Sequence, residues 1–288
     1  MTEETSAQVD RVRAFYDRNT ARFERLGQGG ASIHRAVWGP AVRDRDEAFH
    51  HVEDRLLELL AATPDPVVVD LGCGVGGSLL HLAGRRPDLR GEGITLSPAQ
   101  AQRAGVLLAD AGLDDRVRCR EGDFLDPPAD LDGTADLVLS IEAFLHGPDP
   151  AGYFRAAARL LRPGGRLAIC DDVLTDAGAA ADDDAARRLT DFRDGWRVGS
   201  LVTVPELVRL AGDAGLALVS DDDLTPYLEL RRPRDRAISA ALALARGPLR
   251  LRGEYGRMLV GGDALQRCLT DGLLDYRLLV LARVDDAS

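Results

Sequence analysis

Short apolar runs alternate with amphipathic stretches through the middle of the chain. The run Val67–Leu71 is continuously apolar apart from one acid, as in a strand covered on both faces, and glycines follow it. Further strands are predicted to end at residue 96 and to span 117–121, 135–141 and 166–173. The segments between them read as helices at about 76–85, 98–112 and 150–162, the last two opened by Ser-Pro and Asp-Pro start signals. This alternation predicts a doubly wound α/β sheet.

The flanking segments add helices on one side and two more strands on the other. Helices are predicted over 5–26 and 41–62, and near 182–197. A capping box from Thr203 to Glu206 opens another helix, and strands follow at 216–220 and 276–284. We expect an α/β fold with a Rossmann-like, seven-stranded, mostly parallel sheet and helices on both faces. An N-terminal helical lid (1–62) and a helical cap before the last strand (223–272) are added to a core of 63–222 and 273–288. Asp182–Asp184 and Asp221–Asp223 are predicted to be solvated loops.

The charge and composition exclude several classes of protein. The 288 residues carry a net charge of −11, whereas binding to nucleic acid or to an anionic membrane needs a basic face. Four scattered cysteines form no CxxC pair, so free thiols are expected rather than a zinc site or a disulfide framework. The amino-terminal segment lacks the apolar stretch of a signal peptide, and no apolar run approaches 18 residues. We therefore expect a cytoplasmic protein that contacts neither nucleic acid nor membrane.

One glycine-rich turn carries the strongest chemical signal. Asp70 ends the first strand, and Leu71-Gly72-Cys73-Gly74-Val75-Gly76-Gly77 leads into a helix. Glycines let the backbone approach a ligand closely, and the helix N-terminus offers free N–H groups. On its own this pattern also fits a nucleotide-binding Rossmann unit or a tight turn without a ligand.

Further motifs at the right spacing narrow the interpretation. Gly122-Asp123-Phe124 follows the third strand, and Leu160–Leu167 reads LLRPGGRL before the fifth. Together with the glycine turn, these resemble the motifs of the class I S-adenosylmethionine-dependent methyltransferases. An NAD-binding unit would instead show GxGxxG with an acid about twenty residues later. In this chain Glu92 lies in that range, but Gly-Ile-Thr-Leu-Ser follows it. The resemblance implies S-adenosylmethionine as cofactor, S-adenosylhomocysteine as product, and cofactor contacts from Asp70, Gly72, Cys73, Gly74, Asp123 and Phe124.

The second strand departs from most of that family. It ends in Gly93-Ile-Thr-Leu-Ser-Pro-Ala-Gln100 rather than in an acid, which resembles the branch of tocopherol, sterol and cyclopropane-fatty-acid enzymes. The resemblance implies cofactor contacts from Thr95, Leu96 and Gln100. The first segment is similar to this branch as well, and it implies that Tyr16, Ile33, His34 and Trp38 fold over the cofactor and the substrate.

The stretch after the fourth strand reads Ser140-Ile-Glu-Ala-Phe-Leu-His-Gly-Pro148. It resembles sterol C-methyltransferases, whereas cyclopropane synthases have a carboxylate in place of Leu145. The resemblance implies Ile141 at the cofactor and Phe144 at the substrate. A carboxylate at Glu142 can stabilise a carbocation, and Glu142 or His146 can then remove a proton, with the Tyr16 hydroxyl assisting. The alternatives are that Glu142 caps a turn or binds the cofactor, and that His146 is structural.

The substrate region is marked less clearly. Trp196 follows the fifth strand, where small-molecule methyltransferases build their pockets, and with Trp38 and Phe144 it is a candidate for substrate contact. Arg231, Arg232, Arg234 and Arg236 can grip a diphosphate, or they form a solvated helix face. No metal site is predicted in the chain, and Mg²⁺ is expected only with a diphosphate substrate.

These features predict an S-adenosylmethionine-dependent C-methyltransferase of natural-product biosynthesis. It would act on an alkene carbon of a small, hydrophobic terpenoid or prenylated substrate, through a carbocation that is deprotonated or cyclises. The alternatives are a small-molecule O- or N-methyltransferase, and a cofactor-binding cyclase or isomerase that transfers no methyl group. The long first helix and the cap offer surfaces for a homo-oligomer.

Overall fold

A seven-stranded sheet forms the centre of the molecule. A computed structural model describes residues 3–26, 34–244 and 253–284. The strand order is β3-β2-β1-β4-β5-β7-β6; β7 runs antiparallel to β5 and β6, and the other neighbours are parallel. The strands are β1 (Val67–Leu71), β2 (Arg90–Thr95), β3 (Val117–Glu121), β4 (Ala135–Ile141), β5 (Leu161–Leu174), β6 (Leu216–Asp223) and β7 (Leu274–Arg283). The predicted Rossmann-like sheet is confirmed.

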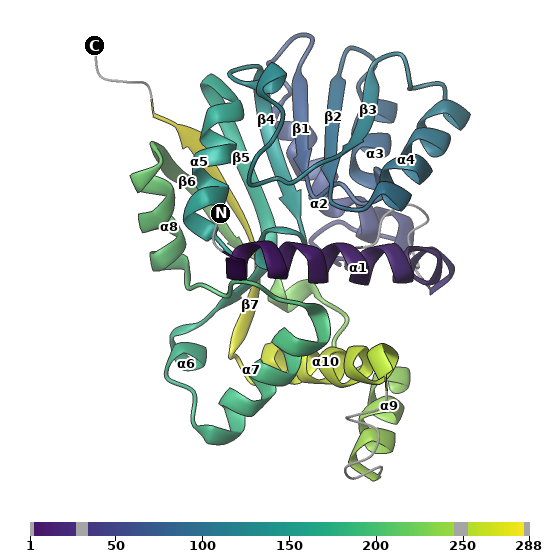
Figure 1. Cartoon of the computed structure of the whole chain (residues 1–288), viewed down its shortest axis with the longest axis vertical. Helices are drawn as coiled ribbons and strands as arrows, with labels where there is room; N and C mark the ends of the chain where they lie inside the picture. Colours follow the sequence, from purple (N-terminus) through teal and green to yellow (C-terminus); the bar gives the residue numbers. More distant parts are fainter. Residues whose placement is uncertain (1–2, 27–33, 245–252, 285–288) are drawn as a thin grey trace.

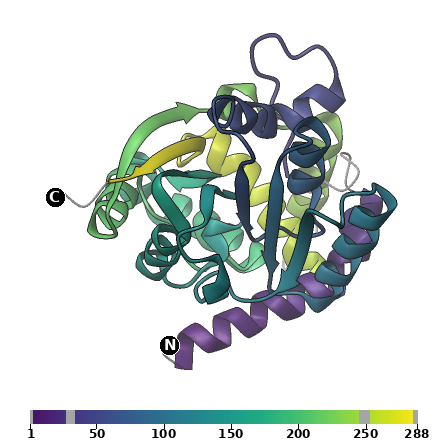
Figure 2. The same cartoon turned by 90° about the horizontal axis from the view of Figure 1, so that it is seen from above.

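Helices cover both faces of this sheet, as Figure 2 shows. Alternate strand residues face opposite sides, so Val68 joins the apolar cluster on one face and Val69 the cluster on the other. The α-helices are α1 (Glu3–Leu26), α2 (Arg45–Leu59), α3 (Gly77–Arg85), α4 (Pro98–Asp110), α5 (Pro150–Leu160), α6 (Asp176–Ala179), α7 (Asp183–Trp196), α8 (Val204–Asp213), α9 (Pro233–Leu244) and α10 (Gly253–Thr270). Three short 3₁₀ turns are η1 (Ala129–Leu131), η2 (Phe144–His146) and η3 (Thr225–Tyr227).

Helices α1, α7 and α10 lie at the edge of the sheet where the parallel strands end. Figure 1 shows α1 crossing this edge, with α7 and α10 on its other side. The Arg13 guanidinium of α1 donates to the carbonyl of Leu96 at 3.1 Å, just after β2. Helix α10 packs closely on α7, because a Cβ built on Gly195 would lie 2.6 Å from the Cα of Gly261. The division of the chain at residues 62, 222 and 272 stays a prediction.

Two predicted acidic loops are wrong. Asp221–Asp223 continue β6, because this strand pairs with β7 as far as Arg277. The Asp221 carboxylate accepts from the Arg277 guanidinium at 2.7 Å, so the charge is neutralised within the sheet. Asp182 caps α7 by accepting from the amide of Ala185 at 2.9 Å, and Asp183 and Asp184 form the first helical turn.

Two element boundaries also differ from the prediction. Helix α2 begins at Arg45 rather than at 41, because the Asp44 side chain caps it by accepting from the Glu47 amide at 3.0 Å. Strand β5 begins at Leu161 rather than at 166, because Leu161 already pairs with Ala135 before the glycine turn.

Candidate active site

A cavity of about 660 Å³ opens at the carboxyl edge of the sheet, which is where ligands bind in doubly wound folds. Its walls come from the ends of β1, β2 and β4, from α1, and from α7, α9 and α10. Fourteen of the residues singled out in the sequence line it together. They are Tyr16, His34, Asp70, Gly72, Cys73, Gly74, Thr95, Leu96, Gln100, Phe124, Ile141, Glu142, His146 and Trp196.

Three of the described residues proposed to contact the cofactor or the substrate lie outside this lining. Phe144 is 2% exposed and packs on Tyr153, with ring centroids 4.8 Å apart, because η2 turns it into the core. The Asp123 carboxylate turns back to accept from the amide of Leu125 at 2.9 Å. Trp38 lies in the segment that pairs with residues 227–228, its amide donating to the Tyr227 carbonyl at 2.8 Å. Ile33 falls outside the described residues.

The glycine turn after β1 is shaped to admit a ligand. Gly72 has a φ of +95°, and a Cβ built on it would lie 2.3 Å from the Cβ of Ala143. The amides of Gly72 and Cys73 both donate to the Ile94 carbonyl, at 2.9 and 3.0 Å, which holds the turn against the end of β2. Helix α3 begins directly after the turn, so its N-terminus faces the same space and favours an anionic group.

Asp70 places an uncompensated carboxyl group at the base of this turn. Burial raises its pKa to about 8, and Glu53 adds to the rise while His34 opposes it. Among the residues that the structure describes, no arginine or histidine forms an ion pair with it. A cationic ligand would therefore be the missing partner of this carboxylate.

The end of β2 offers neutral polar groups in place of the usual acid. The Thr95 hydroxyl donates to Gln100 Oε1 at 2.7 Å, and both side chains are buried. With the glycine turn and Asp70, this lining fits S-adenosylmethionine, which has a cationic sulfonium, an ammonium, a carboxylate and a ribose diol. Hydroxyl and amide groups can bind the diol, Asp70 a cation, and the α3 N-terminus the carboxylate.

Tyr16 and His146 form a hydrogen-bonded pair in the cavity wall. The Tyr16 hydroxyl lies 2.8 Å from His146 Nε2, and His146 Nδ1 lies 3.4 Å from the Arg197 carbonyl. Because a carbonyl only accepts, we assign the imidazole proton to Nδ1, so that Nε2 accepts from the tyrosine. Burial lowers the pKa of His146 to about 4 against the opposing effects of Arg197 and Glu142, so the imidazole is neutral.

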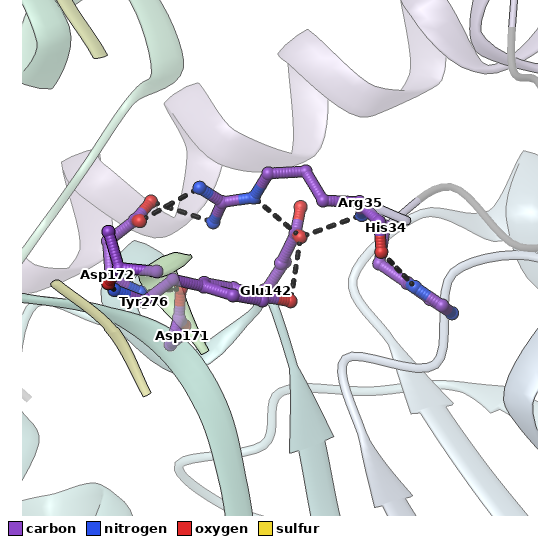
Figure 3. A network of polar contacts seen from close by, with 7 residues as sticks. His34, Arg35, Glu142, Asp171, Asp172 and Tyr276 are labelled. Carbon is purple, nitrogen blue, oxygen red and sulfur yellow. Dashed lines mark hydrogen bonds and ion pairs between the residues drawn. The ribbon is translucent and has the colours of Figure 1, made fainter. Parts of the chain in front are cut away.

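Glu142 is held by a network that the sequence analysis did not find (Figure 3). Its Oε1 accepts from the amide and the Nε of Arg35, each at 2.9 Å, and from the Tyr276 hydroxyl at 3.0 Å. The guanidinium also donates to both carboxylate oxygens of Asp172 at 2.9 Å. Burial raises the pKa of Glu142, but Arg35 and His34 outweigh it, so the pKa is lowered and the carboxylate is ionised.

The partners of Glu142 lie more than one hundred residues away in sequence, which explains why they were missed. The only local signal was the position of Arg35, directly after the candidate His34. His34 itself is tied to α2 and α3, because its Nε2 lies 2.7 Å from Glu53 Oε1, which also accepts from the Ser78 hydroxyl at 3.0 Å. Burial lowers the pKa of His34, but the Glu53 carboxylate outweighs this and raises it to about 9.

The end of the cavity away from the glycine turn is mostly apolar. Arg232 and Arg234 of the predicted cluster reach its lining, but both pair with Asp235, at 3.0 and 3.5 Å. In the described part of the chain, no group of three metal-ligating side chains is found and no helix is both long and apolar enough to cross a bilayer. The apolar lining comprises Phe49, Phe192, Trp196, Leu228, Leu230, Ile238, Met258, Leu259 and Leu265.

Comparison with known proteins shows which family the chain resembles. A family described as "Methyltransferase domain" matches residues 43–221. The chain is 33% identical over 199 residues to 27-O-demethylrifamycin SV methyltransferase of Amycolatopsis mediterranei, covering 69% of this chain and 71% of that protein. Four further curated relatives, which include tocopherol and sterol methyltransferases, are matched over 40% to 57% of their own length.

Solved structures share the fold over nearly the whole chain. A cyclopropane synthase of Mycobacterium tuberculosis aligns with a TM-score of 0.74 at 22% identity, covering 95% of this chain and 98% of the other. Geranyl diphosphate C-methyltransferase of Streptomyces coelicolor A3(2), solved with Mg²⁺, geranyl-S-thiolodiphosphate and S-adenosylhomocysteine, aligns with a TM-score of 0.71 at 20% identity, covering 96% and 98%. The family match, the relatives and the cavity that fits the cofactor agree with one another. The chain belongs to the S-adenosylmethionine-dependent methyltransferases.

Proposed function

We propose that this enzyme methylates an alkene carbon of a small terpenoid or prenylated molecule in natural-product biosynthesis. Bound S-adenosylmethionine supplies an electrophilic methyl group, and the alkene supplies the electron pair of the new carbon–carbon bond. The resulting carbocation loses a proton or cyclises. The observation that carries this proposal is that His146 and Glu142, two neighbouring groups in the cavity wall, are both weak bases.

Base strength separates methylation of an alkene from methylation of an alcohol. An alcohol is about as weakly acidic as water, whose pKa is about 15.7. The His146 imidazole, with a pKa of about 4, and the ionised Glu142 are poor acceptors for such a proton. A C–H bond beside a carbocation is strongly acidic, so a neutral imidazole is sufficient to accept its proton. Alkene methylation also needs no deprotonation before the new bond forms.

The cavity lining also suits a positive charge on the acceptor. The Glu142 carboxylate is ionised and lies in the cavity wall, together with the aromatic side chains of Tyr16, Phe192 and Trp196. Aromatic faces attract cations, and a fixed carboxylate in a water-poor site does so more strongly than in solution. The Tyr16 hydroxyl bonds to His146 and keeps the acceptor nitrogen oriented.

The cofactor contacts are proposed from the residues that line the cavity near the glycine turn. We propose that Asp70 pairs with a cationic group of S-adenosylmethionine and that Thr95 and Gln100 bind its ribose. The remaining proposed contacts are Gly72, Cys73, Gly74, Leu96, Phe124, Ile141 and His34, with Asp123 at the rim. Cytoplasmic location and a homo-oligomer stay predictions of the sequence.

The affinity for S-adenosylmethionine is expected to rise with pH between about 6 and 7.5. Asp70 is largely protonated below its raised pKa of about 8, so binding of a cation must release that proton. The dissociation constant should fall by up to about tenfold per pH unit. Calorimetry in two buffers of different ionisation enthalpy measures the released proton directly.

Two variants test the assignment of this proton. Asp70→Asn should bind more weakly and with no pH dependence. Asp136→Asn, which changes an aspartate outside the cavity, should behave like the wild type. An unchanged slope in Asp70→Asn would assign the proton to another group.

Methylation of a hydroxyl is the second candidate, because two relatives are named as tocopherol O-methyltransferases and the relative from Amycolatopsis as 27-O-demethylrifamycin SV methyltransferase. The two are separated by incubation with methyl-labelled S-adenosylmethionine and a panel of geranyl and farnesyl diphosphate, a prenylated indole, a sterol and a catechol. We expect a product heavier by one methylene, with the label on an alkene-derived carbon in the ¹³C NMR spectrum.

The other outcomes of this incubation are equally clear. Label on oxygen or nitrogen would refute the carbocation mechanism and leave the cofactor site standing. A product of unchanged mass would indicate a cyclase or isomerase. The Gly72→Ala variant, in which the glycine turn is blocked, is the negative control.

A further inference from the structure

Arg35 joins the segment after α1 to the ends of three strands. Its backbone amide and Nε contact Glu142, which follows β4, and its two terminal nitrogens contact Asp172 of β5. Its guanidinium also stacks on the ring of Tyr276 of β7, 3.9 Å from the centroid. Figure 3 shows this side chain lying between the two carboxylates. Arg35 is therefore a fixed part of the wall rather than a mobile surface side chain.

The backbone of Glu142 adds an independent observation. Its φ of +50° lies in the left-handed region, which is strained for a residue with a side chain. Its amide donates to the Cys170 carbonyl at 2.9 Å, and its carboxylate takes three hydrogen bonds on one oxygen. A strained residue held in this way at a cavity wall indicates that the position of its side chain matters.

We propose that Arg35 is a positioning residue for methyl transfer, which keeps the Glu142 carboxylate ionised and fixed at the cofactor end of the cavity. One guanidinium faces two carboxylates, Glu142 and Asp172, so the cluster retains a net negative charge toward the cavity. That charge would stabilise a cation on the acceptor, and this part of the argument rests on the proposed carbocation chemistry. The hold on Glu142 itself does not depend on which acceptor is methylated.

Removal of Arg35 changes the balance of charges around Glu142. Burial favours the neutral acid, and Arg35 is the largest opposing influence, followed by His34. The titratable and charged groups that face Glu142 are Arg35, His34, Tyr16, Tyr276, His146, Cys170, Asp171 and Asp172. Of these, only Arg35 and His34 carry positive charge at neutral pH, and His34 is already paired with Glu53.

The test compares Arg35→Gln and Arg35→Lys with Arg277→Gln. Arg277 is a matched control, because it follows Tyr276 on β7, pairs with two carboxylates at 2.7 and 3.0 Å, and does not line the cavity. Protein labelled with ¹³C at the glutamate carboxyl carbon is titrated by NMR, and the Glu142 resonance is assigned by its loss in Glu142→Gln. This readout needs no acceptor.

In the wild type and in Arg277→Gln, we expect the Glu142 resonance to titrate below its ordinary value of 4.5. In Arg35→Gln the midpoint of the Glu142 titration should rise by about 1 pH unit or more. The midpoint in Arg35→Lys should lie between those of the wild type and Arg35→Gln. An unchanged midpoint in Arg35→Gln, or an equal rise in Arg277→Gln, would overturn the proposal. Calorimetry with S-adenosylmethionine shows whether each variant still folds around its cofactor.

Turnover supplies the second arm, with whichever acceptor of the panel takes the label. Arg35→Gln should lose at least about tenfold in kcat at pH 7, with KM for the cofactor changed less than about threefold. The loss should grow as the pH falls through the new midpoint, because Glu142 then becomes protonated in this variant while it is still ionised in the wild type. A loss that is equal at every pH would mean that Arg35 acts only on folding. Label on a heteroatom would refute the proposed function without altering the NMR result.

Discussion

Replacement of Gly72 by alanine is expected to weaken the binding of S-adenosylmethionine about 100-fold or more, which corresponds to about 2.7 kcal/mol. The φ of +95° is unfavourable for any residue with a side chain, and the new Cβ would lie 2.3 Å from that of Ala143. Relief of this overlap must move either the glycine turn or the backbone after β4, and both line the cavity. Calorimetry with S-adenosylmethionine and S-adenosylhomocysteine measures the loss.

A second glycine of the same region provides the control. Gly84 lies in α3 with no atom within 4 Å of a built Cβ and no positive φ. Gly84→Ala should keep the wild-type affinity and gain about 0.5–1 kcal/mol of unfolding free energy, because alanine favours a helix. If Gly72→Ala bound the cofactor as the wild type does, the glycine turn would not be the cofactor site.

The exchange of Glu142 for glutamine is expected to lower kcat by about 100-fold or more, with the affinity for S-adenosylmethionine changed by less than about threefold. The amide keeps the size of the side chain and one acceptor oxygen for Arg35 and Tyr276. It removes the negative charge that would stabilise a cation or take up a proton. The measurement is methyl transfer in a single turnover, beside calorimetry of the cofactor.

Glu92→Gln is the matched control for this variant. Glu92 lies on β2, pairs with Arg118 and Arg120, and does not line the cavity. It should retain wild-type turnover and affinity. Equal turnover in Glu142→Gln would remove this carboxylate from the chemistry, whereas a parallel loss of cofactor affinity would make it a cofactor ligand.

The sheet and the candidate cofactor residues could be predicted from local patterns. Buried parallel strands are continuous apolar runs, and the order of strand and helix leaves few topologies for a doubly wound sheet. The glycine turn is likewise local, because its positive φ values and the start of α3 follow from consecutive residues. For that reason the sequence alone names Asp70, Gly72, Thr95 and Gln100 as candidates, and the structure places them in the lining of one cavity.

Contacts between distant segments were decided by the tertiary structure alone. The acidic run Asp221–Asp223 has the composition of a loop, yet pairing with β7 makes it a strand, in which Arg277 pairs with Asp221 and Arg55 with Asp222. Phe144 is a substrate candidate from the sequence, but the 3₁₀ turn η2 points it into the core.

Glu142 shows the same division most clearly. Its position after β4 marked it as a candidate from the sequence. Whether it is a free base or a fixed anion depends on Arg35, Asp172 and Tyr276, which come from three other parts of the chain. The ionisation of a buried carboxyl is set by burial and by the charges within a few ångströms, and sequence separation carries no information about either.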